Sequence, residues 1–226
     1  MLTPGNDKLG RQQRICAFGL PSRLTCPGCS PVCARVCYSV HLERRRPSVR
    51  QHYLRNLITS QRADFGPRLL RFLASRPVEV VRIHSADDFY SPAYARQWLA
   101  IIRHAPAVRF YAYRRSWRVR PIRPVLAAMA GQNNLRLWFS CDRSTGLPRR
   151  LPPRVGLAWL MTSPEDCPPA ADLVFRTPHL RATVQKYVPW KRREGRALVC
   201  PVGNGVTGQR TTCSQCGLCW RAIPQP

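Results

Sequence analysis

Residues 78–113 read VEVVRIHSADDFYSPAYARQWLAIIRHAPAVRFYAY, and this stretch decides the fold class. Val78–His84 is rich in β-branched residues, as a buried strand is, and Val108–Tyr113 is a second run of apolar and aromatic residues. Between them, Pro92–His104 has its apolar residues at helical spacing, behind a proline that favours the start of a helix. Two strands joined by a helix form a parallel pair with a crossover connection.

The same alternation continues on both sides of this unit. Further strands are expected at Ile15–Leu20, Leu135–Ser140, Val155–Met161 and Asp172–Phe175, and further helices at Pro47–Arg62, Gly66–Ser75 and Pro121–Ala130. We predict an α/β fold, a partial (open) parallel barrel of about six strands with crossover helices. Residues 1–190 would form this domain, and residues 191–226 a small Cys-rich, metal-stapled tail.

The charge of the chain is strongly positive. Its 226 residues include 37 Lys and Arg against 11 Asp and Glu, a formal net charge of +26. Such an excess favours binding to polyanions, and Arg forks pair well with phosphate, so nucleic acid is a predicted partner. The aromatic and basic residues from Tyr111 to Trp117 could stack on bases, although such an alternation is also typical of a core strand.

No apolar run reaches the length of about 18 residues that a membrane span needs, and residues 1–14 lack the apolar segment of a signal peptide. We therefore predict a cytoplasmic protein with no membrane partner. In that compartment clustered cysteines indicate metal binding before disulfides.

The first cysteine group is Cys26, Cys29, Cys33 and Cys37, in a loop (residues 25–37) directly after the first predicted strand. Structural zinc usually takes its ligands from two separated pairs, so four thiols within twelve residues favour an iron–sulfur cluster, with zinc as the alternative. Three of them could hold a [4Fe–4S] cluster with one iron open to S-adenosylmethionine, as in radical-SAM enzymes. Their usual spacing of three and then two residues is not met, and whether Cys29 is a ligand stays open.

The second group is Cys200, followed by proline, with Cys213, Cys216 and Cys219. Three cysteines two residues apart with a remote Cys-Pro resemble the arrangement of bacterial ferredoxins, which favours a second, auxiliary iron–sulfur cluster. A zinc ribbon is the alternative. Cys16, Cys141 and Cys167 stand alone in the sequence, and Cys141 and Cys167 are expected to be buried.

Loops that follow parallel strands project from one rim of the sheet. The first cysteine loop, Asp87-Asp88, Arg114-Arg115 and Cys141–Arg143 should therefore meet there. We predict His84 and Asp88 as contacts to a bound cofactor and Asp88 also as a catalytic acid–base group. A helix cap and turn before Pro92 is the alternative role for this segment.

Several short motifs together resemble the phage gene product 88 family over about residues 3–180. They are Pro4–Lys8, Cys26-Pro27 with Cys33 and Cys37, Val81–His84 leading to Asp88, Arg109–Tyr113, Phe139-Ser140 and Val174–Arg176. The resemblance implies an α/β fold with a metal held by Cys26, Cys33 and Cys37, in a layout similar to radical-SAM-like proteins. It implies no reaction.

The sequence thus favours an iron–sulfur enzyme of radical-SAM type, with one or two [4Fe–4S] clusters and S-adenosylmethionine bound beside Asp88. Flavodoxin or ferredoxin would be its reductant, and a nucleic acid or a partner bound to it the substrate. The alternative is a non-catalytic nucleic-acid-binding protein stabilised by zinc or a cluster.

Overall fold

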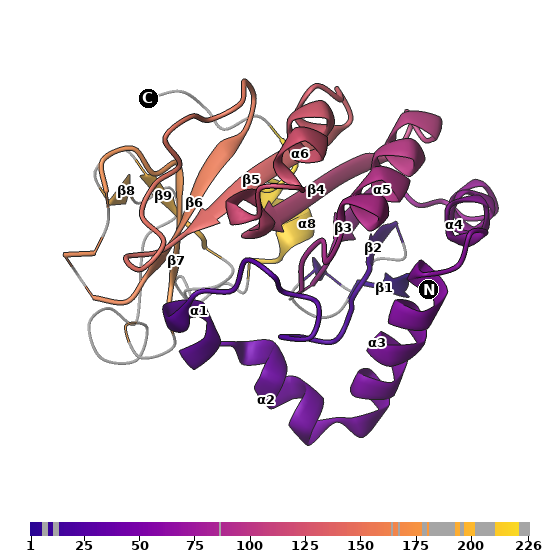
Figure 1. The fold of residues 1–226 in the computed structure, drawn as a ribbon, viewed down its shortest axis with the longest axis horizontal. Coiled ribbons are helices and arrows are strands. Elements are labelled where there is room, and N and C mark those ends of the chain that lie inside the picture. The colour runs from indigo at the N-terminus through magenta and orange to yellow at the C-terminus, as the bar shows by residue number, and fades with distance from the viewer. Residues whose placement is uncertain are drawn as a thin grey trace.

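The structure, a computed structural model, describes residues 1–5, 9–10, 14–85, 87–163, 165–166, 168–177, 180, 193–194, 197–201 and 211–221. Within them, nine strands form one sheet in the order β1-β2-β3-β4-β5-β6-β7-β9-β8 (Figure 1). All six predicted strands are present, as β2 (Ile15–Ala17), β3 (Val80–Ile83), β4 (Arg109–Arg114), β5 (Leu135–Cys141), β6 (Gly156–Met161) and β7 (Leu173–Arg176).

The sheet is mostly parallel. Strands β2 to β7 pair in parallel in the order of the sequence, and β7 continues in parallel to β9 (Ala197–Val199). At the two edges, β1 (Thr3–Pro4) and β8 (Arg193–Glu194) pair antiparallel with their neighbours. The predicted α/β class with an open parallel sheet is confirmed, because each crossover moves the chain one strand further in the same direction.

The tail contributes to this sheet. Leu198 of β9 lies opposite Leu173 of β7, so the chain returns to the main sheet after residue 190. Strand β8 at the edge is two residues long and β9 beside it is three, too short to show a periodicity in the sequence. The boundary between residues 190 and 191 stays a prediction.

The four predicted helices are confirmed, as α3 (Pro47–Ser60), α4 (Phe65–Ala74), α5 (Pro92–His104) and α6 (Arg123–Ala130), and a 3-10 turn η2 (Ser116–Arg118) precedes the last of these. Three of the described helices were not predicted, α1 (Pro31–Arg35), α2 (Tyr38–Arg45) and, in the tail, α8 (Cys213–Cys216). Helix α1 begins where the Ser30 hydroxyl accepts a hydrogen bond from the Cys33 amide and Pro31 fixes the first helical residue.

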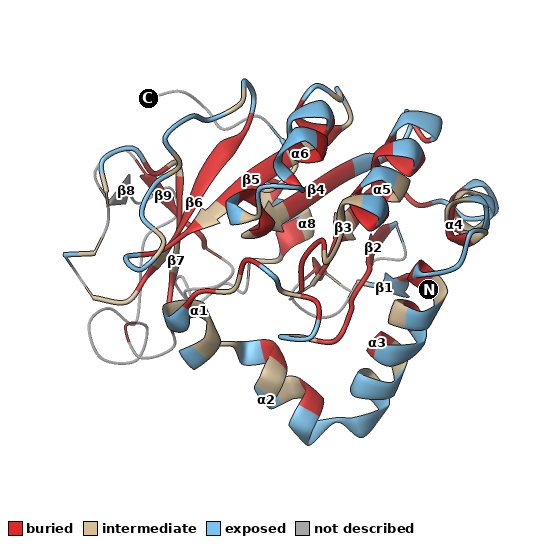
Figure 2. Cartoon of the chain, viewed as in Figure 1, coloured by how far each residue is buried: buried red, intermediate tan, exposed pale blue. Residues whose placement is uncertain are grey.

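Both faces of the sheet are covered. Helices α4, α5 and α6 pack on one face, where Trp98 and Phe110 belong to the main core (Figure 1). On the other face, Cys213 of α8 packs with Tyr111, and the Trp138 indole donates to the Cys219 carbonyl. Figure 2 shows the central strands as mostly buried. Because both faces of the sheet are covered, side chains on both sides of each strand are buried. The strands therefore appear as continuous apolar runs in the sequence.

None of the described helices combines the length and the apolar character that crossing a membrane requires.

Candidate metal centres

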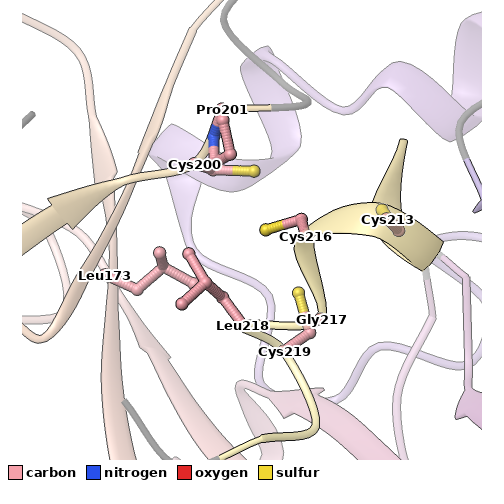
Figure 3. A pocket seen from close by; sticks show the side chains of 8 residues that line it. All are labelled: Leu173, Cys200, Pro201, Cys213, Cys216, Gly217, Leu218 and Cys219. Atoms are coloured by element: carbon pink, nitrogen blue, oxygen red, sulfur yellow. The ribbon is translucent and has the colours of Figure 1, made fainter. Parts of the chain in front are cut away.

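The four cysteines of the tail meet at one small cavity. Cys200 follows β9, Cys213 and Cys216 lie on α8, Cys219 is in the turn after it, and all four line the cavity. Leu173 and Leu218 close its apolar side. In Figure 3 the Cys200, Cys216 and Cys219 side chains turn their sulfur atoms toward the same space. The sequence prediction that these four cysteines form one group in space agrees with this arrangement.

The local sequence explains how the tail brings them together. Thr212 and Gln215 form a capping box that starts α8 immediately before Cys213. Gly217 then takes a φ of 69°, and its amide donates to the Cys213 carbonyl at 2.8 Å. A side chain is strained at that φ, so the glycine ends the helix and turns Cys219 back toward the cavity.

Two side chains of the sheet donate hydrogen bonds to Cys219. The Tyr113 hydroxyl donates to its Sγ at 3.0 Å, and the Trp138 indole donates to its carbonyl at 2.9 Å. Burial raises the pKa of the Cys219 thiol, and it raises that of Cys216 to about 11, with the thiols of Cys200 and Cys213 adding to both effects. Cys216 and Cys219 are therefore neutral in the metal-free protein, so binding a metal here would release protons.

The donor set is all sulfur, which fits an iron–sulfur cluster or zinc. Among the residues described, no three His, Cys, Asp or Glu side chains stand where they could hold a single metal ion. Tetrahedral zinc brings its sulfur ligands to about 3.8 Å from one another, given a Zn–S distance of about 2.3 Å. A cluster keeps its thiolates further apart because several iron and sulfide atoms lie between them. The all-sulfur donor set therefore suits either an iron–sulfur cluster or zinc.

The first cysteine loop lies at the surface. Cys26, Cys29, Cys33 and Cys37 are all partly exposed. The Cys29 amide donates to the Cys26 carbonyl at 3.0 Å, and the Cys33 thiol interacts electrostatically with the thiols of Cys29 and Cys37. Burial raises the pKa of Cys33 to about 11, and Cys29 and Cys37 add to the rise while Arg115 opposes it. The loop thus gathers its thiols at an accessible position.

A buried ion pair anchors this loop to the rim of the sheet. The Ser30 hydroxyl donates to Asp142 Oδ2 at 2.5 Å, and Arg115 donates to the same oxygen at 2.5 Å. Gly28 lies so close to the loop after β4 that a Cβ atom there would be 2.2 Å from the Arg115 carbonyl oxygen. The predicted meeting of the first cysteine loop with the loops after β4 and β5 is confirmed by these contacts.

Asp88 is held by the protein itself. Its Oδ2 accepts from the amides of Arg115 and Ser116, both at 2.7 Å, and its Oδ1 accepts from the Ser116 hydroxyl at 2.6 Å and the Phe89 amide at 2.7 Å. The residue is 3% exposed. These contacts join the loops after β3 and β4 and make Asp88 a positioning residue. The predicted catalytic and cofactor-binding roles stay predictions, and no contact described here supports them.

His84 is also part of the packed rim. Its Nδ1 lies 2.5 Å from Arg114 and its Nε2 lies 2.7 Å from the Tyr94 hydroxyl. Because arginine can only donate, Nδ1 accepts, and Nε2 carries the proton. Burial lowers the pKa of His84 well below its ordinary value, and the charge of Arg114 lowers it further, so the ring is neutral. Its predicted contact with a cofactor stays a prediction.

The segment from Tyr111 to Trp117 does not offer a base-stacking surface. Tyr111 and Trp117 are buried, and the Arg114 guanidinium lies in the core. Tyr113 packs between Trp138 and Phe175, with ring centres 5.7 and 5.1 Å away. This stretch is a core strand, which was the alternative prediction. Of the three lone cysteines, Cys141 is buried as predicted, Cys16 is buried as well, and Cys167 lies outside the described residues.

Comparison with known proteins gives a phage family. The profile of a family described as Gene product 88 matches residues 1–222. The Gene 88 proteins of Mycobacterium phages L5 and D29 are each 27% identical, over 95% of this chain and 85% of their own length. No solved structure matches the chain.

Proposed function

The chain belongs to the Gene product 88 family, a name that states no activity, and from its own residues we propose that it is an iron–sulfur protein with two cluster sites. The tail site would be held by Cys200, Cys213, Cys216 and Cys219. The second would be held by cysteines of the first cysteine loop, Cys26, Cys33 and Cys37, with Cys29 as a fourth candidate.

The observation that carries this proposal is the convergence of the four tail cysteines. They come from two segments separated by residues 202–210, yet they line one cavity closed by leucine side chains. Packing alone gives no reason for four thiols to line the same apolar cavity. Four thiolates around an apolar cavity are what a cubane cluster uses, and the phenol of Tyr113 adds a donor to one of them.

The two sites differ in access, which suggests different roles. The tail site is enclosed between α8 and the sheet. This position suits a cluster that transfers electrons or one that stabilises the fold of the tail. The first cysteine loop is partly exposed and lies at the rim where α/β proteins bind their ligands. Three thiolates there would leave one iron open, and such a cluster supplies reductive cleavage of S-adenosylmethionine when that molecule is bound.

We therefore extend the proposal to an enzyme of radical-SAM type with a partial-barrel sheet. The sequential strand order and the position of the first cysteine loop directly after the first parallel strand support it. In this arrangement Asp142, Arg115 and Ser30 fix the loop against the rim. Asp88 fixes the neighbouring loops, and a flavodoxin or ferredoxin would supply the electron.

The test is anaerobic purification with iron, sulfide, zinc and the visible spectrum measured per chain. We expect brown protein with iron and sulfide. Cys216→Ala and Cys33→Ala should each lose about half of the iron, because each removes a ligand of one cluster. The matched control is Cys16→Ala, which changes a buried cysteine outside both groups and should keep all of it.

Colourless protein with zinc bound would overturn the cluster proposal at both sites. If iron and sulfide are present, the enzyme proposal is tested separately by incubation with S-adenosylmethionine and dithionite. Formation of 5′-deoxyadenosine by the wild type but not by Cys33→Ala is expected. Full iron content without any cleavage would overturn the enzyme proposal and leave the cluster proposal standing.

A further inference from the structure

A large cleft opens between the first two helices and the rim of the sheet. Its volume is about 1030 Å³. Helices α1 and α2 form one wall, and the residues that follow β5, β6 and β7 form the other. Its lining includes Arg35, Tyr38, Arg45, Arg46, Arg143 and Thr162. Figure 1 shows α1 close to the end of β7, where these walls meet.

The cleft is cationic. Four arginines and His41 line it, and none of its lining residues is acidic. Within the described part of the chain, no ion pair joins any of these arginines to a carboxylate. The acidic residue of α2, Glu43, is buried and accepts from Ser22 and Ser39 instead. The arginines are exposed, so their guanidinium groups are available to a ligand.

We propose that this cleft binds a single strand of nucleic acid through its phosphates. Arginine forks pair with phosphate in two parallel hydrogen bonds. The cations are distributed from α1 to the end of α2 and across to Arg143, which suits several successive phosphates better than one. The overall charge of +26 would draw such a strand to the protein.

Tyr38 adds a surface for a base. It is 54% exposed, although its hydroxyl donates to the Ser85 carbonyl. A ring that is fixed at one end and open on its face is suited to stacking on a base. Tyr38 also follows Cys37 directly in the sequence, so a strand in the cleft would pass beside the first cysteine loop. The binding proposal does not require a cluster, and its test is independent of the metal.

The experiment measures binding of a fluorescein-labelled single strand of about twelve nucleotides by anisotropy, at several salt concentrations. It uses the full chain purified anaerobically. The cleft variant combines Arg45→Ala, Arg46→Ala and Arg143→Ala. The control variant combines Arg71→Ala, Arg96→Ala and Arg103→Ala, which remove the same charge from exposed positions of α4 and α5. Equal thermal midpoints check that both variants fold.

We expect the cleft variant to bind at least tenfold more weakly. The slope of log affinity against log salt should fall by about 2, because three phosphate contacts are lost. Tyr38→Leu should weaken binding about tenfold with no change in that slope, because stacking releases no counterions.

Equal weakening by the cleft and control variants would overturn the proposal, because binding would then follow net charge alone. Displacement of the labelled strand by ATP as effectively as by an unlabelled strand would also overturn it, in favour of a free nucleotide as the ligand.

Discussion

The Tyr113 hydroxyl donates a hydrogen bond to Sγ of Cys219 across 106 positions of the sequence, at 3.0 Å. Tyr113 lies on β4 in the centre of the sheet, whereas Cys219 belongs to the tail. The bond therefore connects the rigid part of the fold to a proposed cluster ligand. Hydrogen bonds to cluster sulfurs are among the features that set a reduction potential, because they favour the more negative, reduced form.

Tyr113→Phe should therefore lower the reduction potential of the tail cluster. A net hydrogen bond of about 1 kcal/mol corresponds to about 40 mV for a one-electron couple. The measurement is a redox titration followed by electron paramagnetic resonance. Tyr90→Phe is the control, since its hydroxyl contacts Ser60 instead of a cysteine. A potential unchanged in Tyr113→Phe would show that this hydrogen bond does not act on a cluster.

The parallel strands could be predicted from the sequence. Both faces of the sheet are covered, so each strand is apolar on both sides and appears as a continuous apolar run. The short strands of the tail could not. Residues 197–199 are only three apolar residues, and their place beside β7 depends on pairing with a distant strand. Helix α1 did carry a signal that was missed, since Ser30 followed by Pro31 is a typical helix start.

The candidate site was predictable in its cysteines but not in their supports. Spacing alone grouped the four thiols of the tail. The hydrogen bond from Trp138 to the Cys219 carbonyl joins residues 81 positions apart, and no local pattern indicates it. For Asp88, the sequence indicated the residue but not its role. A carboxylate after a strand can face a substrate or accept from the next loop, and the two cases look alike in a sequence.

Asp88→Ala should destabilise the protein strongly. The change removes a buried acceptor of four short hydrogen bonds and the carboxylate that lies 3.5 Å from Arg114, so we expect a loss of about 3–5 kcal/mol. Urea denaturation followed by circular dichroism measures it. Asp64→Ala, which breaks exposed ion pairs with Arg62 and Arg68, is the control and should shift the midpoint little. An Asp88→Ala protein of normal stability would show that these hydrogen bonds do not stabilise the fold.

The Asp142–Arg115 pair should make stability depend on acid pH. Burial alone would raise the pKa of Asp142, but hydrogen bonds from Ser30 and Ser144, with the charge of Arg115, hold it below its ordinary value of 3.8. A carboxyl with a lowered folded-state pKa stabilises the protein above the unfolded-state pKa, and this contribution is lost as pH falls through the folded-state pKa.

Urea midpoints measured between neutral pH and about pH 3 should therefore fall less steeply in Asp142→Asn than in the wild type, from a lower starting value. Asp64→Asn gives the comparison for an exposed carboxylate. Parallel curves for Asp142→Asn and the wild type would mean that Asp142 has the same pKa in both states.

The metal-free thiols should react slowly at mildly alkaline pH. The pKa of Cys33 and that of Cys216 are both raised to about 11, in each case chiefly by burial. Only the thiolate is alkylated, so at about pH 8 both should react with iodoacetamide about a hundredfold more slowly than free cysteine with its pKa of about 8.5. Mass spectrometry of the two peptides after timed quenching measures each rate separately.

The sign of the pH dependence follows from the same values. Because both pKa values lie near 11, each rate should rise about tenfold per pH unit well past the point where free cysteine levels off. Arg115→Gln should slow Cys33 further, because the charge of Arg115 lowers its pKa, and should leave Cys216 unchanged. Rates equal to that of free cysteine at about pH 8 would show that the two thiols are more solvated than the structure has them.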